Sequence, residues 1–67
     1  MDLVEKIKIL NNHLKAKNFN KVIEGAHKIL KKIPKNDYLL NLIGMAYQGR
    51  SQHNKAINYF KESLKQN

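Results

Sequence analysis

The chain repeats itself with a shift of 34 residues. Residues 20–23 (NKVI) recur as residues 54–57 (NKAI), and six of the 31 positions compared at this shift are identical. Polar interruptions recur in the same register, at residues 17–18 and again at residues 51–52. Self-similarity at such a period is typical of folds in which one small supersecondary unit is stacked on the next.

Apolar residues follow a helical period throughout the chain. They recur at intervals of three and four residues in four stretches, and no stretch alternates with the period of two that a strand would show. The four stretches are residues 3–14, 19–33, 39–47 and 56–64. The sequence therefore predicts an all-α fold of four helices, arranged as two helix-turn-helix hairpins.

Helix ends are marked by a few residues. Pro34 cannot continue a helix, and Asn36 or Asp37 can cap the next one, so the chain divides at this point. A length of 67 residues allows one small domain, which we expect over residues 1–67 with repeat one at 3–36 and repeat two at 37–67.

Two further residue patterns predict local geometry at helix ends. Asp2, followed by Glu5 three residues later, predicts a capping box at the first helix. Gly49 stands where a helix C-terminus favours a residue with positive φ, and we expect it to take that conformation.

A helical hairpin of 34 residues resembles the tetratricopeptide repeat, whose pattern is W-x2-L-G-x2-Y, then A-x3-F, then P. In the second half Leu40 replaces the tryptophan, while the first half places Lys6 at a bulky apolar position and Leu10 at the glycine position, so its leading helix is expected to pack differently from the family norm. The residues that carry the pattern are Pro34, Leu40, Ile43, Gly44, Tyr47, Ala56 and Phe60. The resemblance implies a right-handed α-solenoid fragment.

Tetratricopeptide repeats usually receive an extended peptide or a partner helix in a concave groove, lined by the first helix of each hairpin. The resemblance therefore implies a non-catalytic protein-interaction module with such a groove. By register, the groove residues are Lys8, Asn11, Lys15, Tyr38, Asn41, Leu42, Met45 and Gln48, with Val4 and Ile7 beside them. For Ile7 and Tyr38 a second interpretation stays open, in which they pack the two hairpins together.

Repeat arrays bury their core between neighbouring units, and two repeats without a capping helix leave an apolar face open. The last helix carries Ile57, Phe60 and Leu64 at helical spacing, so we expect a homodimer that covers these side chains. The alternative is that the chain is an excised or engineered piece of a longer array, without a function of its own.

The net charge of +8 is concentrated in repeat one, where nine Lys and two Glu give +7. This charge supports an alternative function, a basic module that binds nucleic acid or another acidic partner through the Lys-rich first repeat. The chain contains only one Arg, however, and Lys, Asn and Ile make up 28 of the 67 residues, a bias that A+T-rich coding would also produce. A solvated basic face is therefore the simpler interpretation.

The residue types that catalysis needs are scattered or missing. The five carboxylates are dispersed, the three glycines do not form a phosphate-binding loop, and there is no cysteine. His13 and His53 lack a second ligand at helical spacing, and His27 has only Glu24, three residues before it. The sequence predicts a protein that is not an enzyme, has no cofactor or metal and no membrane span, and resides in the cytoplasm.

Overall fold

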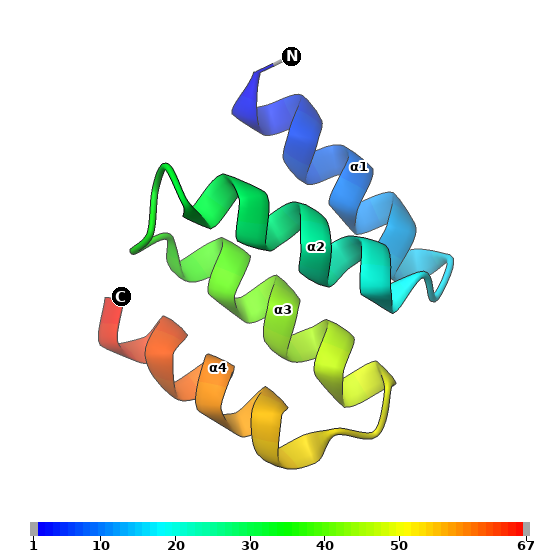
Figure 1. Cartoon of the computed structure of the whole chain (residues 1–67), viewed down its shortest axis with the longest axis vertical. Helices are drawn as coiled ribbons and strands as arrows, with labels where there is room; N and C mark the ends of the chain where they lie inside the picture. The colour runs from blue at the N-terminus through cyan, green and yellow to red at the C-terminus, as the bar shows by residue number, and fades with distance from the viewer. Residues whose placement is uncertain (1, 67) are drawn as a thin grey trace.

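The structure is a computed structural model that describes residues 2–66. It contains four helices, α1 (Leu3–Lys15), α2 (Phe19–Leu30), α3 (Asp37–Gly49) and α4 (His53–Gln66). Each helix packs against the next one along the chain, and no strand occurs between residues 2 and 66 (Figure 1). The all-α fold with four consecutive helices is confirmed.

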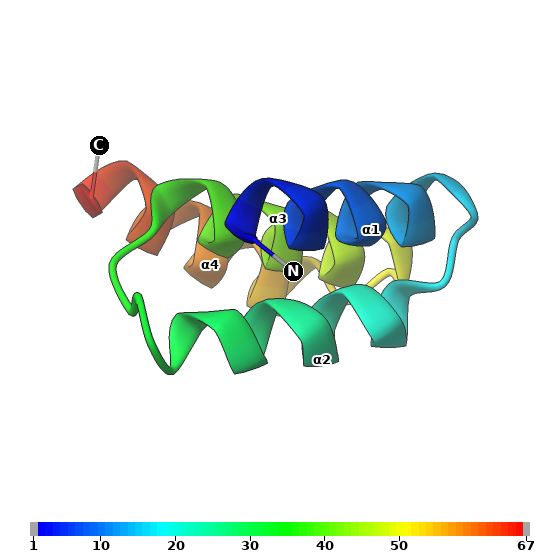
Figure 2. The same ribbon diagram turned by 90° about the horizontal axis from the view of Figure 1, so that it is seen from above.

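The helices form a thin slab, with Cα extents of 32 × 27 × 16 Å. Seen from above, α1 and α3 lie at one level and α2 lies at another (Figure 2). A hydrogen bond joins the two helices of the first level, because Nδ2 of Asn11 in α1 donates to the hydroxyl of Tyr38 in α3 at 3.1 Å. The first helices of the two hairpins therefore share one side of the slab.

Side-chain caps begin α1 and α3 where the sequence predicts them. A carboxylate oxygen of Asp2 accepts a hydrogen bond from the backbone N–H of Glu5 at 2.9 Å. The side-chain oxygen of Asn36 accepts one from the backbone N–H of Leu39, also at 2.9 Å. Each cap satisfies an N–H group that has no partner inside its own helix.

The two hairpin turns have the same geometry, and the left-handed residue in each is not a glycine. Lys17 has φ 63° and Ser51 has φ 62°, and these two residues are 34 positions apart. In both turns the next N–H donates back across the turn, from Asn18 to the carbonyl of His13 at 2.8 Å and from Gln52 to that of Tyr47 at 2.9 Å. This is the Schellman arrangement that ends many helices.

The expectation that Gly49 takes positive φ is wrong. Gly49 is the last residue of α3 and its φ is negative. A Cβ atom at this position would overlap the ring of Phe19, the first residue of α2. The glycine therefore allows close approach between the end of α3 and the start of α2.

The core lies mainly between the two hairpins. Its largest fully buried side chains are Val22 of α2 and Leu39 and Ile43 of α3. No polar or charged side chain is buried within the described part of the chain. The remaining members of the buried cluster are Leu10, Ile23, Ala26, Leu42 and Ala46. Burial of this apolar area supplies most of the stability of so small a domain.

Candidate binding surfaces

The predicted groove residues form one surface of the slab, here called the α1–α3 face. It consists of Lys8, Asn11 and Lys15 of α1 and Tyr38, Asn41, Met45 and Gln48 of α3. Their side chains are exposed, except that of Asn11, which is half-buried. Spacings of three and four residues keep each set on one side of its helix.

Apolar and polar groups alternate on the α1–α3 face. Tyr38 is 47 % exposed and Met45 is 41 % exposed. The Asn41 side-chain amide lies 3.7 Å from the Met45 sulfur, and Asn11 bonds the Tyr38 hydroxyl. Tyr38 thus both links the hairpins and remains accessible, whereas Ile7 is half-buried against the core, as the packing interpretation predicts.

Leu42 does not belong to this face. Only 3 % of its surface is exposed, and it lies in the core cluster with Leu39 and Ile43. Around the helix Leu42 stands about 100° from Asn41 but about 40° from Tyr38, so it lies at the edge of the exposed set, where packing in the core covers it. The prediction that Leu42 contacts a ligand in the groove is therefore wrong.

The outer surface of α4 exposes two of the three residues predicted to mediate self-association. Ile57 is 48 % exposed and Leu64 is 71 % exposed. Phe60 is only half-buried, but its ring lies against Gly44 of α3. We therefore define the α4 stripe as Ile57 and Leu64, because Phe60 holds the second hairpin together.

The residues of the tetratricopeptide-like pattern occupy structural positions. Leu40, Ile43, Gly44 and Ala56 are buried, whereas Pro34 is exposed in the connection between α2 and α3. The pattern thus marks contacts between helices and the break between the hairpins.

Tyr47, the other member of the pattern, belongs to an aromatic cluster that the sequence analysis did not predict. Its ring stacks on that of Tyr59 with centroids 5.5 Å apart, and the hydroxyl of Tyr59 lies 3.4 Å from Nε2 of His27. Lys55 and Arg50 approach the Tyr47 ring within 5.4 and 5.9 Å. Burial, and secondarily the neighbouring Tyr47, raises the pKa of Tyr59.

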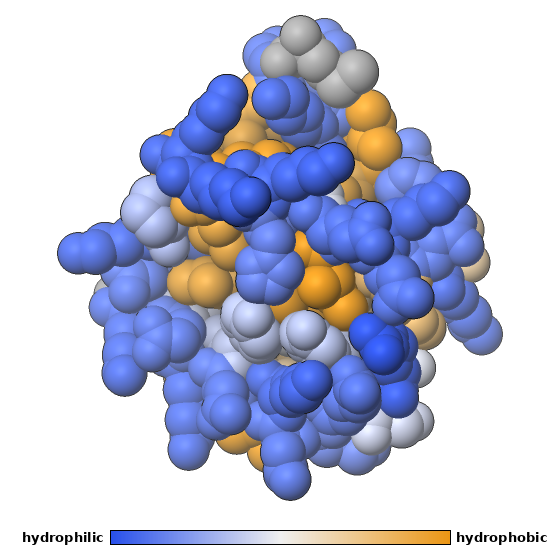
Figure 3. All heavy atoms as spheres, viewed as in Figure 1, coloured by the Kyte–Doolittle hydropathy of each residue, from blue (hydrophilic) through white to orange (hydrophobic). Residues whose placement is uncertain are grey.

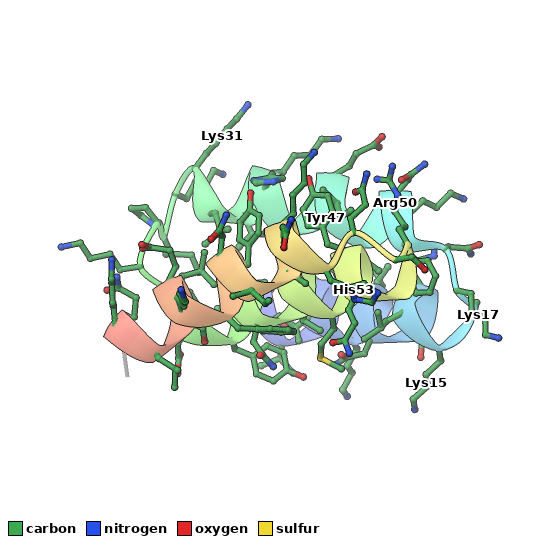
Figure 4. The ribbon with its side chains drawn as sticks, turned by 90° about the horizontal axis from the view of Figure 1, so that it is seen from below. Lys15, Lys17, Lys31, Tyr47, Arg50 and His53 are labelled. Atoms are coloured by element: carbon green, nitrogen blue, oxygen red, sulfur yellow. The ribbon has the colours of Figure 1, made fainter. Side chains whose placement is uncertain are left out.

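The aromatic cluster and the α1–α3 face lie on opposite sides of the slab. Tyr47 and Arg50 project on the side of α2, whereas Lys15 projects on the other side (Figure 4). A ligand on the α1–α3 face would therefore not touch the aromatic cluster.

A groove runs between α1 and α2, with a volume of about 510 Å³. Its floor is apolar and contains Leu3, Ile9, Leu10, Ile29 and Ile33, with Gly25 between them. Lys6, Lys28 and Lys32 are the charged residues that line it. The sequence places Lys28 and Lys32 close together, but only the fold brings Lys6 of α1 to the same groove.

A shallower cleft of about 360 Å³ lies at the start of α2. Lys17, Lys21 and Arg50 line it around Phe19, and the first turn of α2 holds no acidic residue. This arrangement gathers positive charge from both hairpin turns. The sequence predicts excess charge in repeat one, and only the fold brings Arg50 of repeat two to it.

The remaining charged groups show little organisation. Residues 2–66 hold one ion pair, between Lys65 and Glu62 at 3.2 Å, and both side chains are exposed. Over the same residues, no three His, Asp or Glu side chains are placed to share a metal ion. Nor is any described helix long and apolar enough to cross a bilayer.

The sequence matches no protein-family model, and it has no significant match among curated proteins or solved structures.

Proposed function

We propose that the chain is a non-catalytic protein-interaction module of the tetratricopeptide-repeat type, which binds a peptide or partner helix on the α1–α3 face. The hydrogen bond between Asn11 and Tyr38 carries this proposal, because it joins the first helices of both hairpins on one accessible surface. Met45 and Tyr38 offer apolar contact, and Asn41 and Lys8 offer polar contact. Such a mixture suits an apolar anchor inside a polar rim.

The test is selection of binders from a displayed library of short random peptides, followed by titration of the selected peptides by fluorescence anisotropy. Met45→Asp should weaken their binding about tenfold or more, because it puts a charge against an apolar anchor. The matched control is Ile57→Asp, which makes the same chemical change at a similarly exposed residue of α4. Equal loss in both variants, or in neither, would contradict binding at the α1–α3 face.

The proposal includes self-association as a homodimer through the α4 stripe. Ile57 and Leu64 are exposed apolar side chains seven residues apart on one side of α4. A second copy that covers them would remove this area from water. The cytoplasm, a reducing compartment, suits a chain that has no cysteine.

A second candidate function is the binding of nucleic acid or another acidic partner. The cleft at the start of α2 favours it, because Lys17, Lys21 and Arg50 line it together with Phe19. A single-stranded oligonucleotide should then bind with a steep dependence on salt and lose affinity in Lys17→Glu with Lys21→Glu. The control is Lys61→Glu with Lys65→Glu, which has the same net charge; equal binding by both double variants would refute this function.

A further inference from the structure

The α1–α2 groove combines an apolar floor with a rim of one charge sign. Of the apolar residues in its floor, Leu10 is 5 % exposed, while Leu3 and Ile9 are 40 % and 41 % exposed. Apolar atoms are visible between polar side chains over α1 and α2 (Figure 3). Exposed apolar area of this kind is typical of interaction sites rather than of free surface.

Charge restricts what can occupy the groove. All three charged lining residues are lysines, and among residues 2–66 no Asp or Glu lines it. The whole chain carries a net charge of +8, so its field also attracts anions. An occupant should therefore be apolar along its middle and acidic along its edges.

The length of the groove fits a short helix. Leu3 and Leu10 are seven residues apart, and Gly25 and Ile33 are eight apart. At a rise of 1.5 Å per residue these spans are roughly 10 to 12 Å, about two helical turns. A helix that inserts side chains at positions i, i+3 or i+4, and i+7 covers this length.

The α4 stripe of a second copy is a poor occupant. Lys61 lies between Ile57 and Leu64 on the same side of α4, since it is four residues after one and three before the other. Docking this stripe would add Lys61 to the three lysines of the groove. Repulsion between like charges disfavours that arrangement.

We propose that the α1–α2 groove binds an amphipathic helix whose apolar stripe is flanked by Asp and Glu. This site lies outside the α1–α3 face and does not depend on it. The helix would place its apolar side chains on Leu10, Ile29 and Ile33 and its carboxylates near Lys6, Lys28 and Lys32. The apolar floor would supply most of the affinity, and the lysines would set the choice of partner.

The probe is a synthetic helical peptide with leucines at i, i+3 and i+7, glutamates beside them and a fluorescent label. A second peptide carries lysine in place of each glutamate. Fluorescence anisotropy should show saturable binding of the acidic peptide and at least about tenfold weaker binding of the basic one. No saturable binding of the acidic peptide would overturn the proposal, as would equal binding of the two peptides.

Two double variants locate the site. Lys28→Glu with Lys32→Glu should weaken binding of the acidic peptide about tenfold or more, because it reverses two charges on the rim. Lys61→Glu with Lys65→Glu has the same net charge but lies on α4, and it should have a much smaller effect. Circular dichroism of both variants should match the wild type, since all four lysines are exposed. Equal losses in the two double variants would mean attraction by net charge alone and would overturn the proposal.

The apolar floor is tested by Ile9→Glu against Ile57→Glu, two substitutions at similarly exposed isoleucines. Only Ile9→Glu should weaken binding of the acidic peptide. The same variant should also lose the part of that binding which the wild type keeps in high salt. Met45→Asp should leave binding of the acidic peptide unchanged, because Met45 lies on the α1–α3 face. Loss with Met45→Asp and not with Ile9→Glu would move the peptide to that face and overturn the groove site.

Dodecanoate, a fatty acid, should displace the peptide because it competes for the same groove. Saturable binding of dodecanoate without any binding of the peptide would instead assign the groove to a fatty acid and overturn the proposal.

Discussion

The ring of Phe60 in α4 lies against Gly44 in α3, so closely that a Cβ atom on Gly44 would stand 2.5 Å from Cε1 of the ring. The first hairpin contains the reverse arrangement. There Leu10 of α1 is the large residue, and its Cδ2 atom lies 2.5 Å from where a Cβ on Gly25 of α2 would stand. Each hairpin therefore brings its helices together by packing one large side chain on one glycine.

The exchange of sizes explains why repeat one departs from the tetratricopeptide-like pattern. The shift of 34 residues places Leu10 opposite Gly44 and Ala26 opposite Phe60. A large residue in the first helix is thus compensated by small residues, Gly25 and Ala26, in the second. Within this chain the two hairpins therefore differ in packing, because the large and the small residue have exchanged helices.

Gly44→Ala should destabilise the protein by about 1–3 kcal/mol, because the new methyl group would displace the Phe60 ring. A shift of the midpoint in urea unfolding, followed by circular dichroism, measures the change. Phe60→Leu combined with Gly44→Ala should lose less stability than the two single changes added together, because the smaller side chain leaves room. Additive losses would show that the two residues do not pack together in solution.

The arrangement of helices could be predicted from sequence because the relevant signals are local. Apolar periodicity gives the helices, and short polar side chains such as Asp2 and Asn36 give their starts. The left-handed residues could not be identified by residue type, because Lys17 and Ser51 occupy positions where glycine is preferred. Only the repeat register relates these two positions to each other. Gly49 was misassigned because its role, contact with Phe19, joins residues far apart in sequence.

Ser51→Gly should stabilise the protein by about 1 kcal/mol, since glycine takes positive φ without the clash that a Cβ atom creates. For a domain of this size that corresponds to a rise in Tm of about 4–8 °C. Lys17→Gly should raise Tm by a similar amount, because Lys17 has the same positive φ. Lys8→Gly is the control, because Lys8 is exposed in the middle of α1 and the same replacement there should cost about 1 kcal/mol. A fall in Tm with Ser51→Gly would contradict the left-handed turn.

The binding surfaces were less predictable than the fold. The register predicted Lys8, Asn11, Leu42 and Met45 for one accessible face. The structure exposes Lys8 and Met45 and half-buries Asn11, whereas Leu42 is buried, because its burial depends on how the helices pack on one another. The α1–α2 groove was missed for the same reason. Its apolar residues follow the same helical period as those of the core, and only the packing of α1 on α2 shows how much of them stays accessible.

The raised pKa of Tyr59 predicts a loss of stability at alkaline pH. The folded state holds the phenol proton more tightly than the unfolded state, whose tyrosines titrate near 10. Ionisation of Tyr59 therefore does not change the free energy of unfolding below about pH 10, and it lowers that free energy as the pH rises toward the pKa of the folded state. Urea unfolding between neutral pH and the alkaline range should show a decline that Tyr59→Phe reduces. Tyr38→Phe is the control, and an equal reduction in that variant would contradict a specific role of Tyr59.

Leu64→Glu should convert a homodimer into a monomer without unfolding it, because the Leu64 side chain is 71 % exposed and makes few contacts within the chain. Light scattering over a concentration series measures the mass, and circular dichroism measures helicity. Phe60→Glu is the less informative change, since a carboxylate in place of the ring on Gly44 should cost about 2 kcal/mol or more and melt the second hairpin. Met45→Glu, on the α1–α3 face and outside the α4 stripe, should leave the dimer intact. A Leu64→Glu variant with the same mass as the wild type, whether dimer or monomer, would show that α4 does not mediate self-association.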